Sequence, residues 1–298
     1  MLNDIAGFNI EPTNICTLKC PGCSRTQFIN QWPNRWQNHS LDIDNLLNFL
    51  DVDLTGKSIL LCGNYGDPIY HPDFINFVKK FKDRNADISI VTNGSHKKDT
   101  WWQELVECLS ENDRIVFSID GTPENFTEYR INADWSSIKT AIDVCVRSPV
   151  STVWKYIPFS YNQDNIDEVK ELSKQLGMDD FQLLFSDRFD EKTNYLKPAD
   201  DLLGGRYQSQ TEWRTTQSVK VIPKCSNQKE HFITAEGFYS ACCQLTDYRF
   251  YYKSTFGKNK QDYDITKTTL SELLQRGKTV EFYQNLQSNP GCQFNCPG

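Results

Sequence analysis

Residues 7–23 read GFNIEPTNICTLKCPGC, a short apolar run that leads directly into three closely spaced cysteines. The run Gly7–Pro12 is typical of a buried β-strand. Cys16, Cys20 and Cys23 follow it with C-x₃-C-x₂-C spacing, so their thiols lie on one short loop. Three thiolates on one loop can hold three irons of a cubane [4Fe–4S] cluster and leave the fourth iron open to a small molecule. A zinc knuckle or plain structural thiols remain the alternatives, although zinc usually takes a fourth cysteine or histidine.

The cysteine content of the whole chain also indicates metal chemistry rather than a disulfide framework. The chain has 11 cysteines, an odd number, and no export signal is visible at its start. Inside a reducing cell, clustered thiols are typical ligands of soft metals and of iron–sulfur clusters. Five of the cysteines lie within residues 225–298. Cys62, Cys108 and Cys145 stand alone in or beside apolar runs, and we expect them in the core.

Composition and charge exclude several classes of protein. The 298 residues are enough for one large domain, or for a large and a small one. No apolar stretch approaches ~18 residues, so we expect no membrane span and a cytoplasmic protein. With 39 acidic against 32 basic residues, the formal net charge of -7 argues against general nucleic-acid binding.

Strand-like runs alternate with helix-like segments up to about residue 186. Six such alternations predict parallel strands joined by helical crossovers, and hence an α/β fold with a partial (β/α)6 TIM-like barrel. In such folds the functional residues gather where the strands end. The predicted strands are Gly7–Pro12, Ser58–Cys62, Ile88–Thr92, Arg114–Ile119, Thr152–Phe159 and Phe181–Phe185. The predicted helices are Leu41–Leu50, Pro72–Phe81, Trp101–Leu109, Glu124–Arg130, Ser136–Val146 and Ile166–Leu176.

The alternation of strands and helices stops after residue 186. The segment that follows is polar, shows no sustained period and is interpreted as a connector. Two apolar runs that bracket Glu236-Gly237 then predict a β-hairpin, and a helical pattern follows them: Phe232–Ala235, Phe238–Cys242 and Ser271–Gln287. We therefore expect three parts: a core domain over 1–186, a connector over 187–224 and a small domain over 225–298.

Three short motifs follow three successive predicted strands. The second strand ends in Gly63-Asn-Tyr-Gly66-Asp67-Pro68, the third in Thr92-Asn93-Gly94 and the fourth in Ser118-Ile-Asp120-Gly121. Each motif alone is a weak signal, because similar sequences occur in simple turns. Together, and behind the cysteine loop, they resemble the radical S-adenosylmethionine (SAM) enzymes over about residues 7–186.

The resemblance implies a set of SAM contacts. The segment after the second strand is similar to the family's Gly-Gly-Glu-Pro, which holds the SAM amino group, and the segment after the fourth resembles the one that contacts the ribose. An arginine follows where relatives often place one near the SAM carboxylate. The implied SAM-binding residues are Gly66, Asp67, Asn93, Ser118, Asp120 and Arg130. Two positions depart from the family pattern: Asp67 replaces the usual Glu, and Gly22 stands where an aromatic residue commonly faces the adenine.

The chemistry implied by the resemblance is the abstraction of hydrogen from an unactivated C–H bond. SAM would chelate the open iron through its amino and carboxylate groups. One electron from the reduced cluster would cleave the sulfonium C–S bond, which gives methionine and a 5′-deoxyadenosyl radical. The protein would orient the reactants and exclude water. A flavodoxin or a ferredoxin fits the low potential that the reductant needs.

The C-terminal cysteines indicate a second metal site. Their Cys…Gly-x₄-Cys arrangement resembles the SPASM/twitch extensions of radical SAM enzymes, which hold auxiliary [4Fe–4S] clusters. Too few cysteines are present for a full SPASM pattern, so we expect a twitch-type domain with one auxiliary cluster. A zinc site of the Cys₄ type is the alternative. The expected ligands are Cys225, Cys242, Cys292 and Cys296, and Cys243 could substitute for Cys242.

Three functions remain open, besides a rearrangement like that of the molybdopterin-precursor cyclase, whose characteristic C-terminal double glycine is missing here. The leading one is a radical SAM oxidoreductase that dehydrogenates its substrate and passes an electron to the auxiliary cluster, similar to the aminocyclitol dehydrogenase and the anaerobic sulfatase-maturating enzymes. The second is a maturase that epimerises or crosslinks a peptide; no peptide-binding module fits before Cys16, so a partner would have to supply it. The third is a non-catalytic metal-binding or electron-carrier protein. The sequence identifies no catalytic acid or base. The candidate substrate contacts are Tyr65, either Lys155 or Tyr156, and Arg188.

Overall fold

The structure is a computed structural model that describes residues 5–186, 188–203, 222, 230–251, 254–288, 292–293 and 296. Its centre is one sheet of eight described strands in the order β6-β5-β4-β3-β2-β1-β7-β8. All neighbouring strands are parallel except β7 and β8, which pair antiparallel. The described strands therefore form an open α/β sheet, which confirms the predicted fold class.

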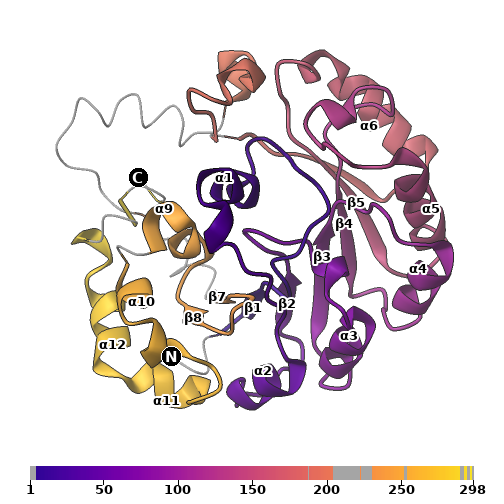
Figure 1. The fold of residues 1–298 in the computed structure, drawn as a ribbon. Helices are drawn as coiled ribbons and strands as arrows, with labels where there is room; N and C mark the ends of the chain where they lie inside the picture. Colours follow the sequence, from indigo (N-terminus) through magenta and orange to yellow (C-terminus); the bar gives the residue numbers. More distant parts are fainter. Residues whose placement is uncertain are drawn as a thin grey trace.

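The six predicted strands are all present, with small changes at their ends. They alternate with helices, and Figure 1 shows helices α3 to α6 in an arc along one face of the sheet. The strands are β1 (Gly7–Ile10), β2 (Ser58–Leu61), β3 (Asp87–Thr92), β4 (Arg114–Ser118), β5 (Ser151–Tyr156) and β6 (Asp180–Leu183). The helices are α1 (Ser24–Gln31), α2 (Ile43–Phe49), α3 (Phe74–Lys82), α4 (Asp99–Val106), α5 (Trp135–Cys145) and α6 (Ile166–Gln175).

The hydrophobic core lies between this sheet and these helices. Helix α3 shows how the sequence encodes that packing: Phe74, Phe77, Val78 and Phe81 recur at helical spacing and are all buried. Strand β3 alternates half-buried and buried residues along its length, as a strand with one face on the core does. Burial of these apolar side chains fixes where each strand ends, and the strand ends carry the predicted functional residues.

The C-terminal part is joined to the same sheet. Strands β7 (Glu230–Ile233) and β8 (Tyr239–Ser240) form the predicted hairpin, and β7 pairs in parallel with β1. The turn between them uses Gly237 at φ 82°, a backbone conformation that glycine adopts without strain. The hairpin thus extends the sheet, with four helices beyond it: α9 (Tyr248–Tyr251), α10 (Thr255–Lys258), α11 (Leu270–Gln275) and α12 (Gly277–Gln284).

Two local predictions were wrong, and one helix was not predicted. The segment predicted as a helix over Glu124–Arg130 forms only a short 3₁₀ turn, Phe126–Glu128. The helix predicted over Ser271–Gln287 is divided into α11 and α12 at Arg276, whose backbone is extended and precedes Gly277, a residue of low helix propensity. Helix α1 was not predicted, because its sequence SRTQFINQ has no apolar period. Within the described residues, no helix is long and apolar enough to cross a membrane.

Candidate functional site

The three N-terminal cysteines line one cavity of about 210 Å³. They lie on the loop that joins β1 to α1, and Cys23 immediately precedes the first helical residue. A backbone hydrogen bond from the Cys23 N–H to the Cys20 carbonyl oxygen (3.1 Å) closes the turn between them. Cys20 is buried, and Cys16 and Cys23 are half-buried. The short cysteine spacing therefore places all three thiols at one opening in the structure.

Burial sets the ionisation of Cys16 and Cys20 in the metal-free protein. It raises the pKa of Cys20 to about 12, although the nearby Arg130 charge opposes the shift. Burial also raises the pKa of Cys16, and a negative charge on Asp67 adds to the shift. Thiolates bind soft metals, so a metal bound here would have to displace the thiol protons.

The arrangement of the three thiols fits a [4Fe–4S] cluster. They lie around the wall of one cavity, where separate irons of a cluster could each take one thiolate. Arg25 lines the same cavity, and its Nε is a buried donor without a hydrogen-bond partner. An anionic or acceptor-bearing group in the cavity would satisfy that donor.

The same cavity collects the motif residues from three strand ends. The loop after β2 and residues at or just beyond the ends of β3 and β4 also line it, and Asn93 Nδ2 lies 3.8 Å from Cys16 Sγ. Of the six residues implied as SAM contacts, five line it: Gly66, Asp67, Asn93, Ser118 and Arg130. The sixth, Asp120, forms an ion pair with Arg130, in which Asp120 Oδ2 lies 2.7 Å from Arg130 Nε. Residues up to 114 positions apart in the sequence therefore meet at one site, as the parallel strands predict.

Asp67 connects two of the segments that line this cavity. One of its carboxylate oxygens accepts a hydrogen bond from Thr92 Oγ1 (2.8 Å), and the other accepts from the backbone and side-chain amides of Asn93. Burial raises the pKa of Asp67 to about 6, and these donors oppose the shift. Asp67 thus ties the loop after β2 to the end of β3 and holds Asn93 toward the cavity.

The Asp120–Arg130 ion pair supports another part of the cavity lining. Asp120 is buried, and its second carboxylate oxygen accepts from the Ile157 N–H at 2.8 Å. Tyr129, beside Arg130, stacks on Phe159 with ring centroids 4.2 Å apart. A Cβ at Gly22 would lie 3.1 Å from the Tyr129 hydroxyl, so Tyr129 occupies the space next to this glycine. The structure thereby explains why a large side chain at Gly22 would not fit.

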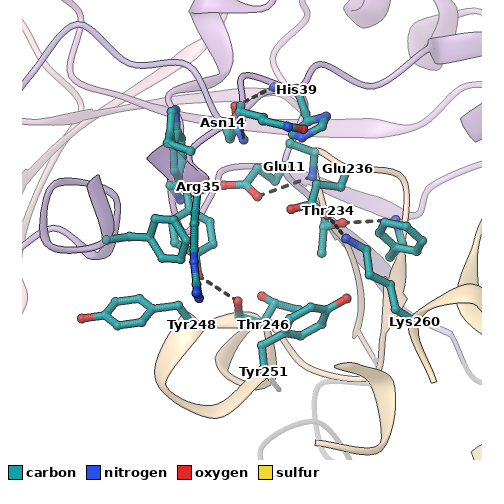
Figure 2. Close-up of a pocket in the computed structure, with 16 residues that line it drawn as sticks. Glu11, Asn14, Arg35, His39, Thr234, Glu236, Thr246, Tyr248, Tyr251 and Lys260 are labelled. Atoms are coloured by element: carbon teal, nitrogen blue, oxygen red, sulfur yellow. Dashed lines mark hydrogen bonds and ion pairs between the residues drawn. The ribbon is translucent and has the colours of Figure 1, made fainter. Parts of the chain in front are cut away.

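A second, larger cavity of about 500 Å³ lies beside the first, and Tyr65 lines both. Its walls come from the ends of β1 and β7, the segment after α1, and the C-terminal turns. Figure 2 shows Tyr248 and Tyr251 across the open space from Glu11. The cavity combines aromatic and charged side chains, among them Phe28, Arg35, Trp36, His39, Glu236, Phe238 and Lys260. Such a mixed lining can bind a ligand that has both apolar and polar groups.

Glu11 is a functional candidate that the sequence reasoning missed. It follows β1 and is 2% exposed, and its Oε1 accepts hydrogen bonds from the backbone amides of Tyr65 (2.7 Å) and Gly66 (3.2 Å). Burial raises its pKa to about 7. The available signal was a charged residue at the end of an otherwise apolar strand, directly before the cysteine loop.

The C-terminal segment contacts the cysteine loop and the loop after β2. The Ser24 hydroxyl, one residue beyond Cys23, donates to Asp247 Oδ2 at 2.6 Å. The Asn64 side chain donates to the Cys243 carbonyl oxygen (2.6 Å) and to Thr246 Oγ1 (2.7 Å). These contacts are buried or half-buried, so the two parts of the chain form one continuous site.

The predicted auxiliary ligands are only partly described. Cys242 precedes the 3₁₀ turn Cys243–Thr246, and Cys292 and Cys296 are joined by a backbone hydrogen bond of 2.8 Å. Cys225 lies outside the described residues. Ile222, three positions before it, donates its backbone N–H to the Cys296 carbonyl oxygen at 2.9 Å. That contact places Ile222 beside Cys296.

The remaining candidates divide into cavity residues and core residues. Tyr65 and Arg188 line the smaller cavity, whereas Lys155 lines neither cavity. The prediction for Tyr156 was wrong: it is fully buried and donates its hydroxyl to the Asn162 carbonyl oxygen at 2.7 Å. Of the three isolated cysteines, Cys145 is in the core and Cys108 packs against it. Cys62 instead lines the smaller cavity, because it follows the last residue of β2.

Comparison with protein families agrees with this geometry. Residues 10–176, more than half of the chain, match the model of the radical SAM superfamily. The chain therefore belongs to the radical SAM superfamily, which implies SAM and a [4Fe–4S] cluster as cofactors. Individual relatives show how far the similarity extends.

Two curated relatives match the chain over part of their length. The "Tungsten-containing aldehyde ferredoxin oxidoreductase cofactor-modifying protein" of Pyrococcus furiosus is 30% identical over 116 residues, which are 38% of this chain and 30% of the relative. The "Cysteine-type anaerobic sulfatase-maturating enzyme" of Clostridium novyi is 30% identical over 122 residues, 39% of this chain and 31% of the relative. The matched part is thus about a third of each relative.

Solved structures share the fold over nearly the whole chain. Streptococcus suis SuiB bound to the precursor peptide SuiA gives a TM-score of 0.62 at 15% identity, covering 99% of this chain and 71% of SuiB. BtrN in complex with AdoMet and 2-DOIA gives a TM-score of 0.50 at 15% identity, covering 100% of this chain and 95% of BtrN. At these identities the likeness concerns the fold alone.

Proposed function

We propose that this protein is a radical SAM oxidoreductase that removes hydrogen from a C–H bond of a substrate bound in the larger cavity. One observation carries the proposal: the cavity lined by the three N-terminal thiols shares Tyr65 with the larger cavity. A reactive species generated in one cavity would therefore form next to a substrate held in the other. Proximity of this kind is what hydrogen abstraction requires.

In this proposal Cys16, Cys20 and Cys23 hold three irons of a [4Fe–4S] cluster. Arg25, with its buried Nε unsatisfied, would donate to the cluster or to the SAM carboxylate. When bound, the reduced cluster and SAM supply a 5′-deoxyadenosyl radical that abstracts a hydrogen atom. The chain's own part is to position the reactants and to keep water away from them.

The SAM-binding role is assigned to Gly66, Asp67, Asn93, Ser118, Asp120 and Arg130. The Gly66 backbone amide donates a hydrogen bond to Glu11. The Asn93 backbone amide donates one to Asp67. Because the Asp120–Arg130 pair is buried, Arg130 cannot move without leaving an uncompensated charge. A site fixed by its supporting contacts suits a cofactor whose reactive atom has to be placed accurately.

The larger cavity is assigned to the substrate. Its aromatic side chains can pack against apolar surface, and its charged groups can orient polar groups of the ligand. We assign the electron acceptor to a second [4Fe–4S] cluster on Cys225, Cys242, Cys292 and Cys296, with residues 225–298 as its domain and 1–186 as the core. Cys242 is preferred over Cys243 because of the Gly237-x₄-Cys242 spacing. A flavodoxin or ferredoxin is the proposed reductant.

A second candidate is the modification of a peptide or protein. The name of one matched relative favours it, since that relative is a sulfatase-maturating enzyme. The structure of SuiB, which was solved with a precursor peptide, has the same fold. The larger cavity would then receive a side chain of the peptide.

Anaerobic reconstitution followed by a SAM-cleavage assay tests the proposed function. We expect 5′-deoxyadenosine to form when dithionite and SAM are added to the reconstituted protein. A Cys16→Ala, Cys20→Ala, Cys23→Ala variant should form none. Cys108 lines neither cavity, so Cys108→Ala should behave as the wild type. Failure of the reconstituted wild type to bind or cleave SAM would contradict the proposal. The remaining alternative would then be a non-catalytic metal-binding or electron-carrier protein.

A further inference from the structure

Glu11 joins the two cavities. Its side chain lines the larger one, and its Oε1 holds the backbone amides of Tyr65 and Gly66, whose residues line the smaller one. Gly63, in the same loop, leaves no room for a side chain next to Glu11, because a Cβ on Gly63 would lie 2.5 Å from Glu11 Oε1. The loop after β2 is thus packed directly on this carboxylate.

The second carboxylate oxygen of Glu11 is held much less firmly. Its bond from the Ala235 N–H is 3.5 Å long, at the outer limit of a hydrogen bond. Figure 2 shows the Glu11 carboxylate turned toward the open space of the larger cavity, near Thr234. A buried oxygen with one weak partner can still accept a strong hydrogen bond from a ligand.

We propose that Glu11 is a positioning residue that couples the two cavities: Oε1 holds the Tyr65–Gly66 loop for SAM, and Oε2 receives a hydrogen-bond donor or a cationic group of the ligand in the larger cavity. This inference rests on the proposed function, which assigns SAM to the smaller cavity. It adds a residue that neither the family motifs nor the sequence pattern marked.

The surroundings of Glu11 determine how its charge responds to pH. Burial raises its pKa from 4.5 to about 7, the three backbone amides oppose the shift, and the charge of Glu236 adds to it. Ionised Glu11 accepts stronger hydrogen bonds from the loop than neutral Glu11, because charge-assisted bonds are about twice as strong. Lys260 is paired with Glu236. The ionisable groups that face Glu11 or line its cavity are Arg35, His39, Cys62, Tyr65, Glu236, Tyr248, Tyr251 and Lys260.

The first test needs no cofactor. In the full-length apo protein, we expect the backbone amide NMR signals of Tyr65 and Gly66 to titrate together with a midpoint near pH 7. Glu11→Gln should abolish that titration, and Glu236→Gln should move its midpoint to lower pH. Amide signals that titrate unchanged in Glu11→Gln, or a midpoint in the ordinary carboxylate range, would overturn the inference. If Glu11→Gln does not fold, a midpoint that Glu236→Gln fails to lower would overturn it.

The second test measures SAM affinity in the reconstituted protein. We expect the affinity of the wild type to rise roughly fivefold between about pH 6 and about pH 8, as Glu11 ionises. Glu11→Gln should give a flat profile, and Glu236→Gln should keep the rise at a lower midpoint. A rise that persists in Glu11→Gln refutes the coupling. A wild type that binds SAM at no pH refutes the proposed function instead, and the amide titration then decides the role of Glu11.

Discussion

Gly66 brings the loop after β2 against the backbone of the cysteine-bearing segment. A Cβ at this position would lie 1.8 Å from the Thr13 carbonyl oxygen, which is backbone and cannot rotate away. The loop could accommodate a methyl group only by moving as a whole. Because Glu11 holds the neighbouring amides, that movement would also break the contacts described above.

We therefore expect Gly66→Ala to lower SAM affinity at least roughly tenfold and to destabilise the fold by about 1–3 kcal/mol. Isothermal titration with SAM and denaturant unfolding would measure the two effects. Gly277→Ala is the matched control, because nothing lies within 4 Å of a Cβ there and alanine favours a helix. Gly66→Ala with wild-type SAM affinity would show that the loop does not bind SAM.

Glu11 also makes the stability of the protein depend on pH. Its pKa is about 7 in the fold against an ordinary 4.5, so the folded chain holds a proton that the unfolded chain has lost. The stabilisation is complete below about pH 4.5 and is lost as the pH rises through about 7. It amounts to about 3 kcal/mol, since each unit of pKa corresponds to about 1.4 kcal/mol.

Chemical denaturation of wild type and Glu11→Gln across this range measures the effect. We expect the free energy of unfolding of the wild type to fall relative to that of Glu11→Gln as the pH rises. The comparison removes the contributions of other buried carboxylates, such as Asp67 and Asp120, whose pKa values burial also raises. A constant difference between the two proteins would mean that Glu11 ionises normally.

At the scale of elements, the C-terminal turn Cys243–Thr246 and the residues after it are fastened to the N-terminal loop. The buried bond from Ser24 to Asp247 starts one residue after the last cluster cysteine, and Phe28 and Trp32 of the same region pack edge-on against Tyr248. The start of α1 therefore serves as the common support of the cysteine loop and of the larger cavity.

Ser24→Ala should destabilise the protein by about 1–2 kcal/mol, because it removes a buried hydrogen bond to the Asp247 carboxylate. Asp247 keeps its pair with Arg249 at 2.8 Å, which limits the loss. Denaturant midpoints of Ser24→Ala and of Ser136→Ala, an exposed serine in α5, would be compared. Equal denaturant midpoints for the two variants would show that the Ser24–Asp247 hydrogen bond does not stabilise the packing of the C-terminal segment on the N-terminal loop.

The elements with strong periodicity were predictable from the sequence, and the elements set by distant contacts were not. Phe74, Phe77, Val78 and Phe81 marked α3 correctly because their spacing alone defines an apolar face. Helix α1 is polar, and it is held by contacts to Asp247 and Tyr248 that no local pattern reports. The hairpin was predicted from its turn, but its pairing with β1 depends on residues more than 200 positions away.

In the candidate site too, residues marked by a local sequence motif were predictable, and residues positioned by distant contacts were not. The motifs at the ends of β2, β3 and β4 were recognisable, because the ends of parallel strands lie at one edge of a sheet. Glu11 was not, since a single carboxylate at a strand end is usually a solvated residue, and its burial arises only when the loop after β2 and the turn after β7 pack over it. Cys62 was placed in the core because the sequence could not show that it lies beyond the last residue of β2.

At the scale of the whole molecule, the proposal requires two clusters per chain. Reconstituted wild type should contain about eight irons, and a variant with Cys242→Ala, Cys292→Ala and Cys296→Ala should contain about four. Cys243→Ala should keep about eight, because the spacing from Gly237 favours Cys242 as the ligand. Iron and sulfide analysis measures both. About four irons in the wild type would exclude the auxiliary cluster, and zinc in its place would favour the Cys₄ zinc alternative.

The central claim is that the cysteine loop leaves one iron open to SAM. The most direct test is the electron paramagnetic resonance spectrum of the reduced protein with Cys242, Cys292 and Cys296 replaced by alanine, recorded with and without SAM. We expect SAM to change the signal of the remaining cluster, because SAM binds the iron that lacks a thiolate. An unchanged spectrum at saturating SAM would contradict the account.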